Sequence, residues 1–262
     1  MLKITVVFMF LVLVCSVSFA AAPDELVLNM SFDSGTIKGN DVMDLSKYGN
    51  KGVFKGAPKV AAGYKGDALS FAGAVATPDS VEMVTSVSLA KTINQISLEA
   101  WVNPNKDALM EVITKWDSLL NGMFHFEIQA GGILRFCLRS GNNAADAVIL
   151  DIKTGGGVVP VGKWTHLAET YDGKTARIYV NGAEVLNGAG VGVIRDSPNA
   201  KYWIGSLYTT DRFFSGSIDE ARIWSKSLTA DEVKKSFDGT LVIGLAVERE
   251  DKLATVWGQI KK

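Results

Sequence analysis

The sequence predicts an all-β fold in which two antiparallel sheets pack as a sandwich, with one short helix near the C-terminus. Short apolar or alternating runs, separated by turn signals, recur along the 262-residue chain. The chain contains 26 glycines and 6 prolines, a composition that favours many turns and few long helices. No internal repeat, low-complexity tract or linker divides it. We therefore expect one sandwich domain.

The expected strands are runs of three to eight residues that are separated by turn signals. They cover residues 26–32, 68–71, 81–84, 96–102, 111–116, 124–129, 133–139, 148–152, 164–171, 175–180, 184–186, 202–207 and 217–224.

Two dipeptides give the sharpest hairpin signals. Asp172-Gly173 joins the runs 164–171 and 175–180, and Asn181-Gly182 follows the second run. Both dipeptides tolerate the positive φ angles that tight hairpin turns need. We expect three consecutive strands connected by hairpins in this region.

The one helical signal covers residues 230–237. Thr229 is a suitable N-cap, and Glu232 lies where it completes a capping box. Val233 and Phe237 are four residues apart and form one apolar stripe, which predicts that this side of the helix is buried.

The two ends of the chain differ from its middle. Lys3, an apolar run over residues 4–14 and the small residues around Ala20 predict a signal peptide over residues 1–20. The apolar run is shorter than the roughly 20 residues that span a bilayer, and Val14 disfavours lipid attachment at Cys15. We expect a secreted protein without a transmembrane anchor after cleavage. Residues 240–262 are expected to form a C-terminal β-hairpin extension of the domain at 21–239.

Charge and cysteine content exclude some roles. Lysine and arginine number 27 and aspartate and glutamate 28, so the net charge is −1 and no basic excess favours nucleic-acid binding. The predicted mature chain retains one cysteine, Cys137, in an alternating apolar run, where we expect a core position. No disulfide framework is expected.

Several segments, in this order, are similar to the laminin-G-like or pentraxin-like jelly-roll domains of the concanavalin A-like lectin/glucanase superfamily. They are LNMSFD (28–33), YKGDALSF (64–71), ISLEAWVNP (96–104), KWTHLA (163–168), YDG (171–173), IYVNG (178–182) and FSGSIDEARIW (214–224). The resemblance covers about residues 26–238 and implies a two-sheet jelly-roll sandwich. Its members include carbohydrate binders, adhesion modules and protein-interaction domains, so the fold leaves function open.

The resemblance also implies a structural calcium ion between the opening and closing strands. Asp33 and Asp219 match the acidic positions of those strands, and loop carbonyls could complete an oxygen ligand set. Phe71-Ala72-Gly73 replaces the family's Phe-Asp-Gly, which removes one acidic position. The alternative is that Asp33 caps a turn and Asp219 pairs with a base such as Arg222.

Strand alternation points to one candidate ligand surface. Glu99 and Trp101 lie on the opposite face of their strand from Leu98 and Ala100, and Arg177 and Tyr179 alternate in the same way with Ile178 and Val180. Aromatic rings and charged groups together suit sugar binding, although the same residues also suit structural packing. Three aromatic residues are further candidates: Trp116, Tyr208 and Phe213.

Catalytic signals are weak. Neither His125 nor His166 belongs to a zinc motif, and we expect both to be structural. The chain has no Glu-x-Asp-x-x-Glu strand and no Gly-x-Ser-x-Gly elbow. We expect a non-catalytic, lectin-like module whose partner is a glycan or a cell-surface or matrix protein. A protein-interaction domain is the alternative, and a glycosidase with carboxylates from separate strands is the least supported one.

Overall fold

The computed structural model describes residues 22–76, 78–83, 88–89, 94–116, 122–140, 148–192, 194, 200–208 and 211–243. The expected signal peptide and most of the expected C-terminal hairpin lie outside these residues. The described residues 241–243 are not part of a strand. No helix in the described ranges is long and apolar enough to cross a membrane.

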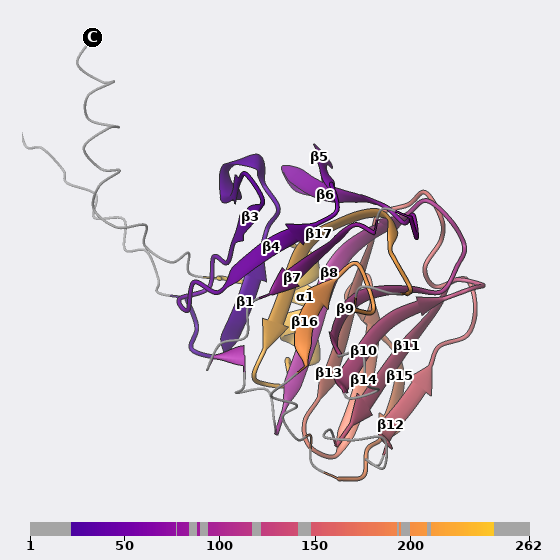
Figure 1. The fold of residues 1–262 in the computed structure, drawn as a ribbon. Coiled ribbons are helices and arrows are strands. Elements are labelled where there is room, and N and C mark those ends of the chain that lie inside the picture. Colours follow the sequence, from indigo (N-terminus) through magenta and orange to yellow (C-terminus); the bar gives the residue numbers. More distant parts are fainter. Residues whose placement is uncertain are drawn as a thin grey trace, which may run out of the picture.

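The predicted sandwich is confirmed, and Figure 1 shows its two antiparallel sheets. The eight-stranded sheet follows the order β15 (Ala183–Ala189), β14 (Thr175–Val180), β13 (Thr165–Tyr171), β8 (Ile96–Pro104), β17 (Ser215–Trp224), β6 (Asp67–Ala72) and β5 (Lys59–Ala62), and β1 (Leu26–Met30) pairs with β17.

The nine-stranded sheet packs against it. Its order is β12 (Val148–Lys153), β11 (Ile133–Arg139), β10 (Gly122–Gln129), β9 (Met110–Trp116), β16 (Lys201–Ile204), β7 (Ser80–Met83), β4 (Lys51–Lys55), β3 (Asp41–Met43) and β2 (Ile37–Lys38). A short 3₁₀ helix, Ser34–Thr36, follows β1.

Both hairpin signals are confirmed. The β13–β14 turn contains Gly173 at φ 96°, and Asp172 Oδ1 accepts the backbone N–H of Thr175 at 2.8 Å. Asn181 and Gly182 both have positive φ and connect β14 to β15. The turn chemistry therefore sets the register of these three strands.

The core fills the space between the sheets, and alternation decides which side chains enter it. Phe124, Phe126 and Ile128 of β10 are buried there, as are Leu134 and Phe136 of β11. The intervening residues of these strands face the outer side of the nine-stranded sheet.

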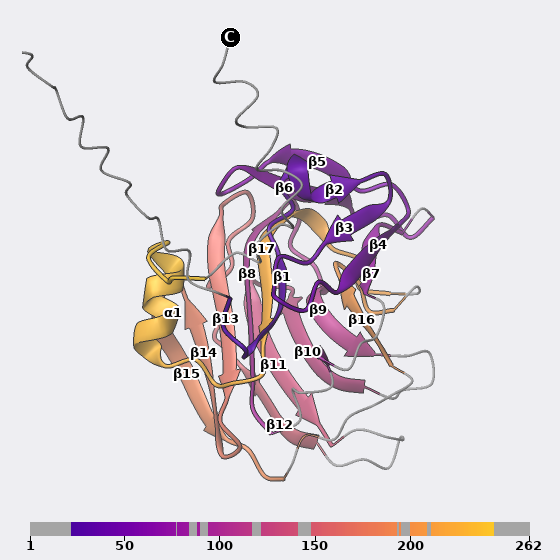
Figure 2. The ribbon, with the colours of Figure 1, turned by 90° about the vertical axis from the view of Figure 1, so that its left-hand side faces the viewer.

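The helix α1 (Ala230–Phe237) begins at Thr229, and its capping box with Glu232 is confirmed. Figure 2 shows α1 lying against the outer side of the eight-stranded sheet, next to β13 and β14. Beneath it lies a second apolar cluster made of Leu26, Ala168, Tyr179, Trp224, Leu228 and Val233. The sandwich therefore has a third partial layer on one face.

Candidate functional site

The predicted ligand residues lie together on the outer face of the eight-stranded sheet. Glu99 of β8 opposes Ala168 of β13, which in turn opposes Tyr179 of β14. Trp101 and Arg177 lie on the same face of β8 and β14. The alternation argument thus places all four side chains on one face.

Helix α1 and one loop cover most of that face. The ring of Trp101 stacks on Tyr64, with centroids 3.3 Å apart, and on Phe237 of α1, with centroids 5.6 Å apart. Trp101 is 5% exposed and Tyr179 1% exposed. The aromatic surface expected for sugar stacking is therefore occupied by the protein's own side chains.

Glu99 belongs to a buried polar network. Its carboxylate lies 3.3 Å from Arg222 Nη1, 3.1 Å from Trp224 Nε1 and 3.4 Å from His166 Nε2. Burial on its own raises the pKa of Glu99, but His166 and Arg222 outweigh it and hold this pKa at about 2. This carboxylate stays ionised and links β8 to Arg222 and Trp224 of β17.

Arg177 is the member of the four that stays accessible, with its side chain about one-third exposed. It pairs with Asp172 at 3.0 Å and with Glu184 at 3.8 Å. A groove of about 440 Å³ lies beside it, between β14 and the start of α1. Its lining also includes Gln95, Ser227, Thr229 and the edge of Tyr179. We call this feature the Arg177 groove.

The two aspartates expected to bind calcium hold the same loop between β5 and β6. Asp33 Oδ1 accepts the N–H of Asp67 at 3.1 Å, and Asp219 Oδ2 accepts the N–H of Lys65 at 3.0 Å. Arg222 pairs with Glu99 and Glu220 rather than with Asp219, so the alternative pairing is wrong.

Asp219 is fully buried, and its Oδ1 has no hydrogen-bond partner in the described part of the chain. Burial raises the pKa of this carboxyl to about 7. A buried carboxylate oxygen without a partner is chemically suited to a hard cation. Calcium binding by Asp33 and Asp219 stays a prediction.

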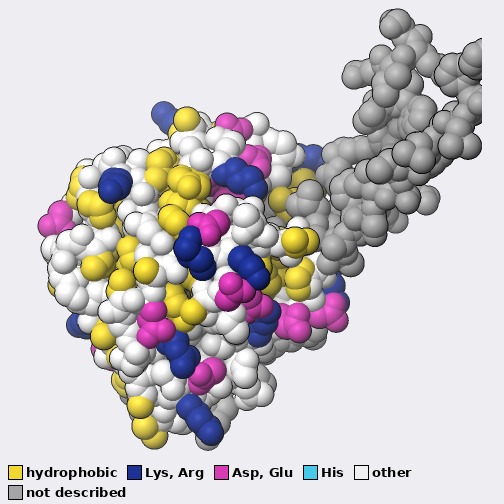
Figure 3. All heavy atoms as spheres, turned by 180° about the vertical axis from the view of Figure 1, so that it is seen from behind, with side chains coloured by type: hydrophobic (Ala, Val, Ile, Leu, Met, Phe, Trp, Pro, Cys, Tyr) yellow, Lys and Arg dark blue, Asp and Glu magenta, His cyan; other side chains and the backbone are white. Residues whose placement is uncertain are grey.

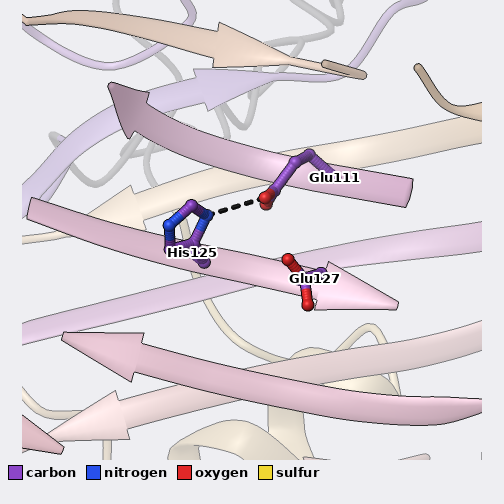
Figure 4. Close-up of side chains that lie close together, drawn as sticks. All are labelled: Glu111, His125 and Glu127. Carbon is purple, nitrogen blue, oxygen red and sulfur yellow. Dashed lines mark hydrogen bonds and ion pairs between the residues drawn. The ribbon is translucent and has the colours of Figure 1, made fainter. Parts of the chain in front are cut away.

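A cluster that the sequence did not reveal lies on the opposite side of the molecule, on the outer face of the nine-stranded sheet. Glu111 of β9 and His125 and Glu127 of β10 point toward one another (Figure 4). His125 Nδ1 lies 2.7 Å from Glu111 Oε1. Arg212 Nη1 contacts both carboxylates. We call these four residues the sheet-face cluster.

The two carboxylates of the cluster have opposite pKa shifts. Burial raises the pKa of Glu111 above its ordinary value, although His125 and Arg212 beside it act in the opposite direction. Burial acts on Glu127 in the same direction, but Gln129, Arg212 and Arg135 outweigh it and lower its pKa. Their environments therefore move the pKa values of two otherwise identical groups in opposite directions.

This pair bears on the glycosidase alternative. Ligand atoms of Glu111, His125 and Glu127 lie within 4.8 Å of one another, so carboxylates from separate strands do converge. Both glutamates are, however, 0% exposed and lie beneath Arg212. The structure thus offers a carboxylate pair that a sugar ring does not reach.

Two of the aromatic candidates pack against other rings, and the third is buried. Trp116 ends β9 and packs against the His125 ring, with centroids 4.4 Å apart. Phe213 is 5% exposed, and Tyr208 packs edge-on against Trp203.

Cys137 lies two strands from Glu111 on the same outer face, not in the core, and burial raises the pKa of its thiol to about 12. It is an inert thiol.

Comparison with known proteins places the fold. Residues 73–234 match the family described as the concanavalin A-like lectin/glucanases superfamily. No curated protein matches the chain. Domain 4 of AbnA, a GH43 extracellular arabinanase from Geobacillus stearothermophilus solved with arabinotriose, is similar with a TM-score of 0.57 and 21% identity, covering 80% of this chain and 97% of that one.

Two toxin binding domains are also similar in fold. The binding domain of Paraclostridial Mosquitocidal Protein 1 has a TM-score of 0.65 and 14% identity, covering 82% of this chain and 52% of that one. The binding domain of Botulinum neurotoxin DC, solved with rat synaptotagmin II, has a TM-score of 0.62 and 15% identity, covering 83% and 52%. The chain thus spans about half the length of these toxin domains. With its two-sheet sandwich and a family match over more than half of its length, the chain belongs to the concanavalin A-like lectin/glucanases superfamily.

Proposed function

We propose that the protein is an exported, non-catalytic binding module that takes a short carbohydrate in the Arg177 groove. The observation that carries this proposal is the groove itself. It is the place where an accessible member of the predicted ligand face borders a hollow of small-molecule size.

The chemistry of the groove suits sugar hydroxyls. Asp172 and Glu184 supply carboxylate acceptors, Arg177 and Gln95 supply planar donors, and Ser227 adds a hydroxyl. Charged groups form the stronger hydrogen bonds to neutral ligands. Arg177 is held in place by Asp172, so binding requires little ordering of its long side chain.

The comparisons support a binding role over catalysis. The AbnA domain was solved with a bound oligosaccharide, and both toxin domains are binding domains. The molecular face opposite to Figure 1 intersperses lysine and arginine with aspartate and glutamate (Figure 3). Such a surface favours neutral or mixed-charge ligands over a polyanion.

The test is a glycan array followed by titration calorimetry with a glycan that binds. Arg177→Gln should weaken binding at least about tenfold, because it removes a charged donor worth about 1.4 kcal/mol or more. Arg139→Gln on β11 is the matched control and should bind as the wild type does. If no glycan on the array binds, or if Arg177→Gln binds as well as the wild type, a carbohydrate site in this groove is contradicted.

The second proposal is a protein partner for the same groove. It is supported by the neurotoxin domain, which was solved with a protein receptor. A pull-down in which an Arg177-dependent partner is retained after deglycosylation would favour it over carbohydrate binding.

Export and calcium complete the proposal. The apolar run at residues 4–14 supports export, and N-terminal sequencing of the protein released by an expressing cell should begin close to residue 21. The unpartnered Asp219 oxygen supports a calcium ion held with Asp33 beside the β5–β6 loop.

A further inference from the structure

The sheet-face cluster brings together three side chains that could hold a metal. Glu111 and Glu127 are direct cross-strand partners on β9 and β10. His125 lies two residues before Glu127 and therefore on the same face of β10. Paired strands fix these positions more firmly than a loop would.

The ligand atoms are the kinds that transition metals select. One imidazole and two carboxylates suit zinc and related divalent ions, whose bonds to such atoms are about 2.0–2.2 Å long. Two ligands of one ion are then at most about 4.4 Å apart. One ligand atom from each residue already lies within 4.8 Å of the other two, so small side-chain movements suffice.

A second observation indicates that this cluster suits a metal ligand. Glu111 is fully buried, and its Oε2 has no hydrogen-bond partner among the residues described. A buried polar atom in this state is destabilising, because it has lost its hydrogen bonds to water without gaining others. A metal bound through this oxygen would satisfy it, which nothing in the described surroundings does.

Arg212 occupies the place that such an ion would take. Its guanidinium contacts both glutamates from the solvent side, where its side chain is 22% exposed while theirs are 0% exposed. Its Nε has no hydrogen-bond partner in the described surroundings. Its backbone has φ 53°, a conformation that residues other than glycine rarely adopt.

Arg212 also has an alternative ion-pair partner outside the cluster. Asp211 is exposed, and its carboxylate lies 4.0 Å from Arg212 Nε. A guanidinium that leaves the cluster could therefore pair with Asp211 at the surface. A divalent ion in place of the guanidinium would put two positive charges, instead of one, next to the two buried carboxylates.

We propose that Glu111, His125 and Glu127 form a binding site for a divalent transition metal ion such as zinc, and that Arg212 is the counter-ion which this metal displaces. The site lies on the opposite sheet from the Arg177 groove and does not depend on the proposed function.

The test is zinc titration of the full-length protein, purified without a histidine tag, by calorimetry at neutral pH. The wild type should bind one zinc ion. Glu127→Gln and His125→Ala should each weaken binding by about 100-fold or more, because each removes a direct ligand. Arg212→Gln should bind zinc more tightly than the wild type, since no guanidinium has to leave.

Matched controls make the result decisive. Glu82→Gln, on β7 of the same sheet, should bind zinc as the wild type does, and circular dichroism should show every variant folded. If His125→Ala does not fold, Glu127→Gln carries the test. Cobalt should give visible absorption bands in the wild type that are absent in Glu127→Gln. No zinc binding by the wild type, equal binding by Glu127→Gln, or weaker binding by Arg212→Gln would overturn the proposal.

Discussion

Asp219 should make the stability of the protein depend on pH between about 4 and 7. Its side chain is fully buried in β17, one oxygen accepts the N–H of Lys65, and the other has no partner among the described groups. Burial raises the pKa of this carboxyl from 3.8 to about 7. The substitution Asp219→Asn keeps the size and one acceptor oxygen but cannot ionise.

The magnitude follows from the two pKa values. The gap between 3.8 and about 7, at about 1.4 kcal/mol per pKa unit, amounts to about 4 kcal/mol. Because the pKa is higher in the folded state, the neutral carboxyl favours folding. This contribution is fully present below the unfolded pKa and is lost as pH rises through the folded pKa. The asparagine side chain is neutral at every pH in this range. The free energy of unfolding of Asp219→Asn should therefore rise by about 4 kcal/mol relative to that of the wild type as pH rises from about 4 to about 8.

The assay is urea unfolding of both proteins in chelator at a series of pH values. Asp238→Asn, an exposed change at the end of α1, is the control and should stay parallel to the wild type. Added calcium should stabilise the wild type at high pH and leave Asp219→Asn unchanged, because a bound ion favours the ionised carboxylate. Parallel pH curves for the wild type and Asp219→Asn would refute the reasoning about burial. A calcium response in Asp219→Asn would refute the ion site alone.

Three further substitutions test other parts of the structure by urea or thermal unfolding. Glu169→Leu should raise the free energy of unfolding by about 1–3 kcal/mol, because both carboxylate oxygens of Glu169 are buried without partners in the described chain. Burial also raises the pKa of Glu169 well above its ordinary value, so this gain should grow as pH rises. A loss of stability would contradict this reasoning. Glu99→Gln should destabilise by about 3 kcal/mol by depriving buried Arg222 of one charge partner. That difference should shrink as pH falls from 4.5 toward 2, since the folded carboxylate is protonated near pH 2. Phe237→Ala should cost about 2 kcal/mol and expose Trp101, so an unchanged tryptophan emission maximum would argue against the packing of α1.

The sequence predicts the fold well where local signals are strong. Period-2 alternation and the turn residues Asp172-Gly173 and Asn181-Gly182 correctly identify the long strands and their pairing. The strands that it misses, β2 to β5, are two to five residues long, and β5 exposes most of its side chains. Their pairing comes from neighbouring strands rather than from an apolar pattern of their own.

The predicted ligand face shows what alternation leaves out. It places Trp101 and Tyr179 on the outer face, but it does not say what covers that face. The stripe of Val233 and Phe237 on α1 carries this information, because an apolar stripe needs an apolar partner surface. The partner is the aromatic face itself, more than 50 residues away in the chain.

The sheet-face cluster was hidden by a break in the alternation. Strict period-2 counting from buried Ile113 puts Glu111 on the core face, where a carboxylate is unfavourable. The structure instead has a register shift, in which Ile113 opposes Phe126 while Glu111 opposes Glu127. Val112 is the additional residue, and both it and Ile113 enter the core. Such bulges redirect side chains and often lie beside functional sites. The bulge at Val112 is therefore what turns Glu111 outward, toward His125, and creates the cluster.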